Sequence, residues 1–217
     1  MARKTKQQAQ QTRQQIIDAA IKAFSERGVS ATSLSDIAIE AGVTRGAIYW
    51  HFKNKVDLLS IVCKISEHKI DELEKEYQAK HPNNPLLALR SLLVSLLRMM
   101  IDDFQSRQLI EIFFHKCEFV GEMSSLVEEL RETCISDYKK IEKMLEACIQ
   151  KGELPYNLDL RRSAIMLRAL VTGLLENWSF SPDSFNIQEQ ATYLVDSFID
   201  TLKYSHHLRR EEKMRLE

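Results

Sequence analysis

The chain has 217 residues, of which six are glycine and four are proline, and its formal net charge is −1. That length allows one large domain or two modest ones and excludes a disulfide-stapled miniprotein. A β-sandwich or barrel needs a turn about every 8–12 residues, and so few turn formers cannot supply them. Alternating βαβ units are also disfavoured, because runs of Val, Ile and aromatic residues flanked by Gly are missing. The composition therefore predicts an all-α protein.

The charge is distributed unevenly along the chain. Residues 1–55 contain nine basic and four acidic side chains and carry a net charge of +5, whereas residues 56–217 carry −6. Such an asymmetry is typical of an anion-binding segment attached to a body with a different task. The near-neutral total therefore does not exclude a nucleic-acid-binding protein.

The four cysteines predict neither a disulfide framework nor a zinc site. No C-x-x-C pair and no histidine spacing suited to zinc occurs, so we expect reduced thiols in a helical core and no metal or cofactor. No apolar segment follows the basic N-terminus, and the most apolar windows, 91–97 and 169–175, are shorter than the ~20 residues that cross a bilayer. The pattern favours a soluble, cytoplasmic protein with no membrane partner.

Hydrophobic periodicity and helix-ending residues predict about nine helices. The first covers 9–27, a short one begins at Ser33, and another is capped by Thr44 and continues through Phe52. The others are expected at 56–79, 85–103, 106–118, 123–150, 158–179 and 187–204. We therefore expect a three-helix N-terminal domain at 1–55, a helical ligand-binding and dimerisation domain at 56–204, and a polar tail at 205–217.

The two short helices, joined by Ala-Gly-Val at 41–43, form a helix-turn-helix pattern. Gly42 stands where the chain must turn sharply, in a conformation that a Cβ opposes. Ile37, Val43 and Ile48 supply the small core that sets the crossing of the two helices. An Arg on the second helix is suited to reading guanine. We expect its outward face to contact DNA through Thr44, Arg45, Ala47, Tyr49 and Trp50.

The segment from Ser33 to Lys55 resembles the DNA-binding signature of the TetR family of transcriptional regulators. The shared skeleton is a hydroxyl residue, Leu, Ile-Ala, Ala-Gly-Val-Thr, a Gly, Ile-Tyr-x-His-Phe and a Lys. The resemblance extends over nearly the whole chain, to regulators of multidrug efflux genes, and weakens in 56–110 and after about 200. It implies that a set of residues lies at the DNA, with Lys55 on phosphate: Thr44, Arg45, Gly46, Tyr49, Trp50, His51 and Lys55. We include Ser33 in the expected DNA-binding set as well.

Two parts of the N-terminal domain have a second interpretation. The aromatic run 49–52 is also typical of a core cluster; Phe52 follows Ile48 by one turn and is expected in the core, while Tyr49 and His51 cannot both share that face. The basic N-terminus is either a solvated tail or a flexible arm on phosphates or in the minor groove. We favour the arm, because the first 17 residues contain no acid; its basic residues are Arg3, Lys4 and Lys6.

The last two expected helices carry more apolar surface than one chain covers easily. Gly173 allows close backbone approach, so a second copy would bury this seam in a four-helix interface; burial within the monomer is the alternative. A symmetric dimer would place two recognition helices about 34–36 Å apart and require a palindromic operator. The expected interface residues are Leu167, Leu170, Val171, Leu174, Leu175, Trp178, Leu194 and Phe198.

The middle helices carry soft and aromatic side chains that suit varied apolar ligands, although such residues are more often plain core. They are Met99, Met100, Phe113, Phe114, Met144 and Met166. Glu67 lies at the border of an apolar stripe, where its carboxylate would attract a cationic compound; a surface salt bridge with Lys64 is the alternative. The TetR-family resemblance favours the ligand role. We include Ile70, Asn177 and Cys63 in the pocket, and Cys63 stands where the related pattern has an aromatic residue.

These features predict a homodimeric repressor of multidrug efflux genes. We expect it to bind double-stranded DNA at a palindromic operator and to leave it when a lipophilic, often cationic compound binds. One alternative is an architectural or constitutive DNA-binding dimer whose body only dimerises. Another is an enzyme with an attached DNA-binding domain, but the sequence shows no nucleophile–base set, phosphate-binding glycine loop or metal spacing. We therefore expect that the protein is not an enzyme.

Overall fold

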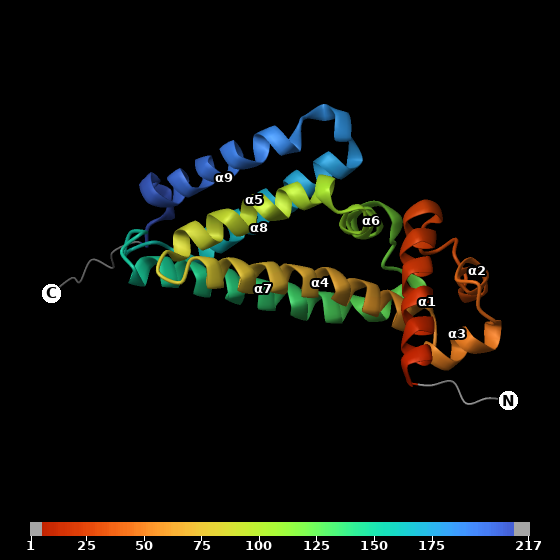
Figure 1. Cartoon of the computed structure of the whole chain (residues 1–217). Helices are drawn as coiled ribbons and strands as arrows, with labels where there is room; N and C mark the ends of the chain where they lie inside the picture. Colours follow the sequence, from red (N-terminus) through yellow and green to blue (C-terminus); the bar gives the residue numbers. More distant parts are fainter. Residues whose placement is uncertain (1–5, 211–217) are drawn as a thin grey trace. The chain divides into compact units, whose positions relative to one another are not determined.

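The computed structural model describes residues 6–210 and is helical there, with nine α-helices and short 3-10 and π turns (Figure 1). The expected helices are all present, and most of their ends differ from the prediction by only a few residues. Within this part of the chain, no helix is both long and apolar enough to cross a membrane. The helices are α1 Lys6–Arg27, α2 Leu34–Glu40, α3 Arg45–His51, α4 Lys55–Lys80, α5 Pro85–Asp102, α6 Phe104–Glu111, α7 Leu126–Gln150, α8 Leu160–Phe180 and α9 Ile187–Tyr204.

Local capping sets the limits of α2 and α3. Asp36 N donates to Ser33 Oγ at 3.2 Å, and Ser33 N donates to Asp36 Oδ2 at 2.9 Å, which is a complete capping box. Ala47 N donates to Thr44 Oγ1 at 3.2 Å and caps α3. Gly42, between the two helices, has a φ of +65°, which strains any residue with a Cβ. The helix-turn-helix is therefore specified within about a dozen residues.

The chain packs as two compact units. Unit 1 contains the residues up to 69 together with 103–130. Unit 2 contains 70–102 together with the residues from 131 onward. Because α4 and α7 each contribute to both units, the segment expected to read DNA, 1–55, is part of a larger packing unit.

The core of unit 1 lies where α1 packs against α2, α3 and α6. Phe24, Ile37 and Ile48 are 0% exposed and Phe52 is 1% exposed. Burying each such side chain contributes about 1.5–3 kcal/mol. The small core expected between the two short helices is confirmed for Ile37 and Ile48, and Val43 packs against it while partly buried.

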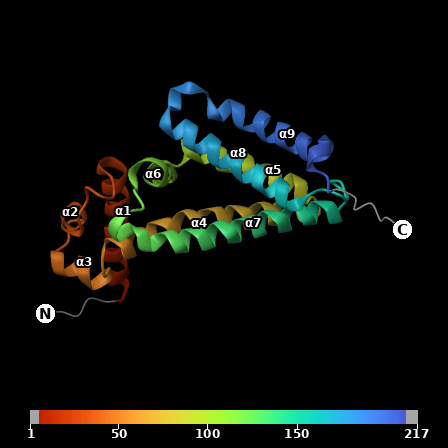
Figure 2. The ribbon, with the colours of Figure 1, turned by 180° about the vertical axis from the view of Figure 1, so that it is seen from behind.

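In unit 2, α5 lies against α8 and α9, and the second halves of α4 and α7 run side by side (Figures 1 and 2). Lys140 Nζ on α7 lies 2.7 Å from Asp71 Oδ1 on α4. Arg90 on α5 forms a two-pronged ion pair with Asp196 on α9, with Nη2 to Oδ2 at 2.8 Å. Charged pairs therefore link the facing sides of these long helices.

The helix expected at 106–118 is interrupted. The α-helical part ends at Glu111, and a π-helical turn follows over Ile112–Lys116. The carbonyl of Lys116 then accepts the N–H of Val29, just after α1, at 2.9 Å. The wider turn ties the segment after α6 to the loop that precedes the helix-turn-helix, a tertiary contact that hydrophobic periodicity does not report.

The expected polar tail is anchored as far as residue 210. Leu208 is 4% exposed, and its carbonyl accepts the N–H of Asp159 at 2.8 Å. The Arg209 guanidinium donates to the carbonyls of Leu202 and Lys203 at the end of α9. Composition alone suggested a solvated tail for 205–210, but the last carbonyls of a helix lack intrahelical partners and attract such donors.

Candidate DNA-binding surface and ligand cavity

α3 buries one face and presents the other to solvent. Ile48 is 0% exposed, whereas Tyr49 is 49% and Trp50 is 72% exposed. The aromatic run is therefore divided: Phe52 belongs to the core, as expected, and Tyr49 and Trp50 do not. A tryptophan that is this exposed is typical of a binding surface.

The exposed side chains of α3 contact one another. Arg45 is exposed, and its guanidinium carbon lies 6.0 Å from the centroid of the Tyr49 ring, within cation–π range. The rings of Trp50 and half-buried His51 meet edge to face, with centroids 4.5 Å apart. A cationic donor fork and two aromatic rings thus share one exposed surface, which we call the α3 face.

The smaller residues expected at the DNA have local structural roles. The hydroxyls of Ser33 and Thr44 cap helices, yet both residues remain exposed at the surface. The Thr44 hydroxyl accepts a hydrogen bond in the cap, so its own proton is available to an outside acceptor. Gly46 is exposed and Ala47 half-buried, so the start of α3 has little side-chain bulk.

Lys55 contacts the protein itself. Its Nζ donates to the carbonyls of Val29 at 2.9 Å and Ser30 at 3.4 Å, and so joins the start of α4 to the loop after α1. This structural partner was not expected, and it competes with the phosphate contact that the resemblance implies. Lys6 is exposed at the start of α1. Arg3 and Lys4 lie outside the described residues.

Two acidic side chains of the N-terminal domain, Glu40 and Asp36, form hydrogen bonds with neighbouring residues. Lys22 on α1 pairs with Glu40 on α2, and this hydrogen bond lowers the pKa of Glu40. The hydrogen bonds from Ser33 likewise lower the pKa of Asp36. Both carboxylates are therefore ionised at neutral pH, and Lys22 offsets the charge of Glu40, which limits the repulsion between Glu40 and an approaching phosphate backbone.

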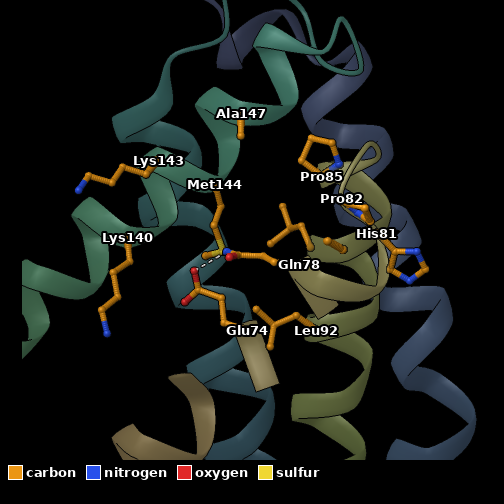
Figure 3. Close-up of a pocket in the computed structure, with 12 residues that line it drawn as sticks. Glu74, Gln78, His81, Pro82, Pro85, Leu92, Lys140, Lys143, Met144 and Ala147 are labelled. Atoms are coloured by element: carbon orange, nitrogen blue, oxygen red, sulfur yellow. Dashed lines mark hydrogen bonds between the residues drawn. The ribbon is translucent and has the colours of Figure 1, made fainter. Parts of the chain in front are cut away.

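Unit 2 contains a cavity of about 400 Å³ between α4, α5 and α7 (Figure 3). Its volume lies in the range of small-molecule sites. Met144, one of the soft side chains singled out in the sequence, lines it. Its other lining residues include Glu74 and Gln78 from α4, Leu89 and Leu92 from α5, and Ala147 from α7.

Four of the expected ligand residues belong to unit 1 and do not line this cavity. Cys63 is 6% exposed, and Glu67, Phe113 and Phe114 are half-buried. Burial raises the pKa of the Cys63 thiol to about 12, so the thiol is neutral. Lys64, the alternative partner for Glu67, has its Nζ 2.8 Å from Glu129 Oε1.

The other four expected ligand residues lie in unit 2 but do not line the cavity either. Ile70 and Met166 are each 39% exposed, and Met99 is half-buried. Asn177 is exposed, and its amide donates to the carbonyl of Gly173 at 2.7 Å. Asn177 lines an open groove along α8, with residues that were expected at a dimer interface.

The expected interface residues fall into two groups. Leu167, Trp178 and Phe198 are 2%, 6% and 3% exposed within the single chain. They pack in the core of unit 2, which favours the alternative of burial within the monomer for these three residues: α8 is apolar on nearly all sides, and the chain itself buries one of those sides. The second group is half-buried in the single chain and consists of Leu170, Val171, Leu174, Leu175 and Leu194.

Glu74 and Gln78 on the cavity wall were not predicted from the sequence. Their i, i+4 spacing is visible in the chain, but an acid and an amide one turn apart are common on solvated helices. Among the described residues, no group of three or more His, Cys, Asp or Glu side chains is placed to hold a metal ion.

A compact helix-turn-helix with an exposed recognition helix, joined to a helical unit with a ligand-sized cavity, defines a DNA-binding transcriptional regulator. Residues 16–61 match the model of bacterial regulatory proteins of the tetR family, and residues 84–204 match the C-terminal region of MAATS-type transcriptional repressors. The chain belongs to the TetR family of transcriptional regulators, which are not enzymes.

Individual members of the family are similar over most of their length. The chain is 52% identical to the HTH-type transcriptional regulator AcrR of Shigella flexneri over 191 residues, which are 88% of this chain and 89% of that relative. NalD, the secondary repressor of the MexAB-OprM multidrug efflux pump in Pseudomonas aeruginosa, matches with a TM-score of 0.80 and 28% identity, covering 92% of this chain and 100% of NalD. SmeT of Stenotrophomonas maltophilia, in complex with triclosan, matches with a TM-score of 0.78 and 26% identity, covering 93% of this chain and 96% of SmeT.

Proposed function

We propose that this protein is a homodimeric repressor of multidrug efflux genes, which leaves its operator when a lipophilic, often cationic compound binds. The observation that carries the proposal is the α3 face, with Arg45, Tyr49 and Trp50 exposed on a capped recognition helix. The similarity to NalD, a repressor of an efflux pump, supports the kind of gene that is regulated. A regulator of chromosomal genes acts in the bacterial cytoplasm.

The α3 face contacts bases in the major groove. The Arg45 guanidinium offers two parallel N–H donors, which match the O6 and N7 acceptors of guanine. The exposed rings of Tyr49 and Trp50 add apolar contact with thymine methyl groups and with the sugar–phosphate backbone. Backbone contacts by Thr44, Lys6 and the N-terminal arm would set the register.

Two copies associate through the outer side of α8 and α9. One side of α8 carries the half-buried side chains of Leu170, Val171 and Leu174. Phe180, at the end of this helix, is 80% exposed. Leu170 and Leu174 also border the open groove along this helix. Association of two such apolar seams makes a symmetric dimer and thereby requires a palindromic operator.

A bound compound lowers operator affinity if it prefers a conformation in which the two α3 helices no longer match the groove spacing. The triclosan complex of SmeT supports a small lipophilic compound as ligand. The cavity of about 400 Å³ in unit 2 has space for one. Half-buried Glu67 on α4 and neutral Cys63 remain candidates for further ligand contacts.

The proposal is tested on the DNA upstream of the protein's own gene and of neighbouring efflux-pump genes. Footprinting at physiological salt should show protection of a palindrome, at least a hundred-fold tighter than binding to a scrambled duplex. Tetraphenylphosphonium, a lipophilic cation that does not intercalate, should weaken that protection. Equal affinity for both duplexes, unaffected by the cation, would identify an architectural DNA-binding dimer instead.

A further inference from the structure

Arg13 lies on the side of α1 that packs against the end of α3. Its guanidinium carbon is 5.4 Å from the centroid of the Phe52 ring, within cation–π range. Phe52 is the C-cap of α3 and is 1% exposed. Figures 1 and 2 show the first half of α1 beside the end of α3. An arginine of α1 is therefore placed next to the recognition helix.

The positive charge of Arg13 is not neutralised by the residues that the structure describes. None of their carboxylates forms an ion pair with it, and its N–H groups donate no hydrogen bond to them. Asp18, the first acid in the sequence, instead accepts a hydrogen bond from Gln14 Nε2 at 2.9 Å. Arg13 is half-buried, and contact with a ring occupies only one side of a planar guanidinium. Its N–H donors therefore remain available to an outside acceptor.

Other cations flank Arg13 in α1 and in the loop after α3. Lys6 precedes it by about two helical turns and therefore lies on the same side of α1. Lys53, directly after Phe52, is exposed. The acid in this loop region, Asp57, accepts the N–H of Lys53 at 3.1 Å and so caps the chain locally. The edge of unit 1 beside the end of α3 thus carries mainly positive charge.

A phosphate group fits this arrangement. A guanidinium binds phosphate oxygens through two parallel N–H···O bonds, and the two sugar–phosphate backbones border the groove that a recognition helix enters. The Phe52 ring restricts the Arg13 side chain, so binding removes less of its entropy. Because the exposed α3 face lies beside it, the phosphate is that of a nucleic acid rather than of a phosphopeptide.

We propose that Arg13 binds a phosphate of the DNA backbone beside the end of α3, with Phe52 as its positioning residue. The inference rests on the proposed function and adds a contact from α1 to those of α3 and the N-terminal arm. The contact is independent of base sequence, so it raises affinity for every duplex and helps to set the orientation of α3 in the groove. One ring of the core thereby supports both the fold and the DNA contact.

The test measures the affinity of the full-length protein for operator and scrambled duplexes over a range of salt concentrations. Arg13→Gln removes the charge and keeps a polar side chain. We expect this variant to bind both duplexes about ten-fold more weakly, as the loss of a charge-assisted hydrogen bond implies. The slope of log K against log[salt] should fall by about one for each bound chain. Arg13→Lys keeps the charge and should keep the slope.

Arg107→Gln is the matched control. The Arg107 guanidinium carbon also lies over a phenylalanine ring, 5.5 Å from the centroid of Phe104, but on α6. That helix meets α1 near its other end, where Gln108 Nε2 donates to Ser25 Oγ at 3.0 Å. Arg107→Gln should therefore leave both affinities and the slope unchanged. Urea denaturation shows that each variant is folded.

Two results would overturn the inference: an unchanged salt slope in Arg13→Gln, or a slope that falls equally in Arg13→Lys and Arg13→Gln. A loss of stability in Arg13→Gln with the slope unchanged would show that Arg13 only covers the Phe52 ring. Failure of the proposed function appears separately, as equal affinity of the unaltered protein for the two duplexes. Because the slope is measured on each duplex, the role of Arg13 is decided in either case.

Discussion

Arg45 contacts an aromatic ring on its own helix. Its guanidinium lies 6.0 Å from the Tyr49 ring on the next turn of α3, and that contact restricts a side chain with several rotatable bonds. Ordering a side chain in advance reduces the entropy that binding must remove. The Tyr49 ring therefore helps to position the arginine as well as offering contact area.

The substitution Arg45→Ala should relax base preference at one position of each operator half-site. If the guanidinium reads a guanine, its loss costs roughly 1–3 kcal/mol there and much less elsewhere. Band-shift titrations against operators substituted one base pair at a time measure this. Lys75→Ala, on an exposed part of α4, should leave the profile unchanged. A base profile unaltered by Arg45→Ala would contradict base reading by this residue.

The Cys63 thiol should be unreactive in the folded protein. Burial raises its pKa to about 12, and burial does the same for Cys148. Because the pKa of each thiol is raised, both thiols stay protonated at pH values well below about 12, and the nucleophilic thiolate is scarce. Iodoacetamide at pH 8, followed by mass spectrometry, should leave both cysteines unmodified until denaturant is added. Alkylation of Cys63 in the native protein would show that the site opens.

At the scale of elements, the helix-turn-helix is held from outside as well as by its own caps. Lys55, the first residue of α4, bonds to the carbonyls of the loop after α1, and the N–H of Val29 in that loop bonds to Lys116 in the π-helical turn. Two segments that follow the helix-turn-helix in the chain thus meet at the loop that precedes it. The position of α2 and α3 depends on this junction.

The variant Lys55→Met should destabilise unit 1 while keeping the apolar stem of the side chain. The loss of a charge-assisted hydrogen bond to a backbone carbonyl costs about 1.5–3 kcal/mol, measurable by urea denaturation. We expect the salt dependence of operator binding to keep its slope. A phosphate contact would instead reduce the slope of log K against log[salt] by about one with little change in stability. That pattern would restore the role implied by family resemblance.

At the scale of the whole molecule, the outer surface of α8 would decide whether the two DNA-binding domains of the proposed dimer act together. Its half-buried leucines border an open groove, and Gly173 has no heavy atom within 4 Å of the position that a Cβ would take. A second backbone can therefore approach this helix closely. Apolar seams of this kind are typical of surfaces that associate.

The substitution Leu174→Arg should convert the dimer to a monomer. Placing an unpaired charge in an apolar interface has a desolvation cost that the seam cannot offset. Sedimentation would show half the mass, and operator affinity would fall steeply because each head would bind alone. Tyr156→Arg, at a position 75% exposed in the loop before α8, is the control. A Leu174→Arg protein that remains dimeric would place the interface elsewhere.

The sequence predicted the helices and the motif well, because their determinants are local. Caps at Ser33 and Thr44 and the left-handed turn at Gly42 involve neighbours a few residues apart. The sequence was less informative about how α8 packs. Leu167 and Trp178 belong to the core of unit 2, since the apolar pattern of a helix does not say which of its sides the same chain covers.

The cavity was beyond reach of the sequence for a related reason. Its wall combines residues near 74, 90 and 145, which three separate helices bring together. No local spacing distinguishes Glu74 from the other acids of α4, and the apolar border and the family pattern indicate Glu67 instead. Whether a carboxylate faces a cavity or solvent depends on the rotation of α4 against α5 and α7.

By itself, then, the amino-acid sequence determined the all-helical class, the helix-turn-helix and the polar face of α3, because hydrogen bonds and periodicity within single elements encode them. Only the tertiary structure decided which apolar side chains are core, where Lys55 bonds, how the tail is anchored and which carboxylate borders the cavity. These features depend on contacts between residues distant in the chain. Packing, rather than local preference, selects those contacts.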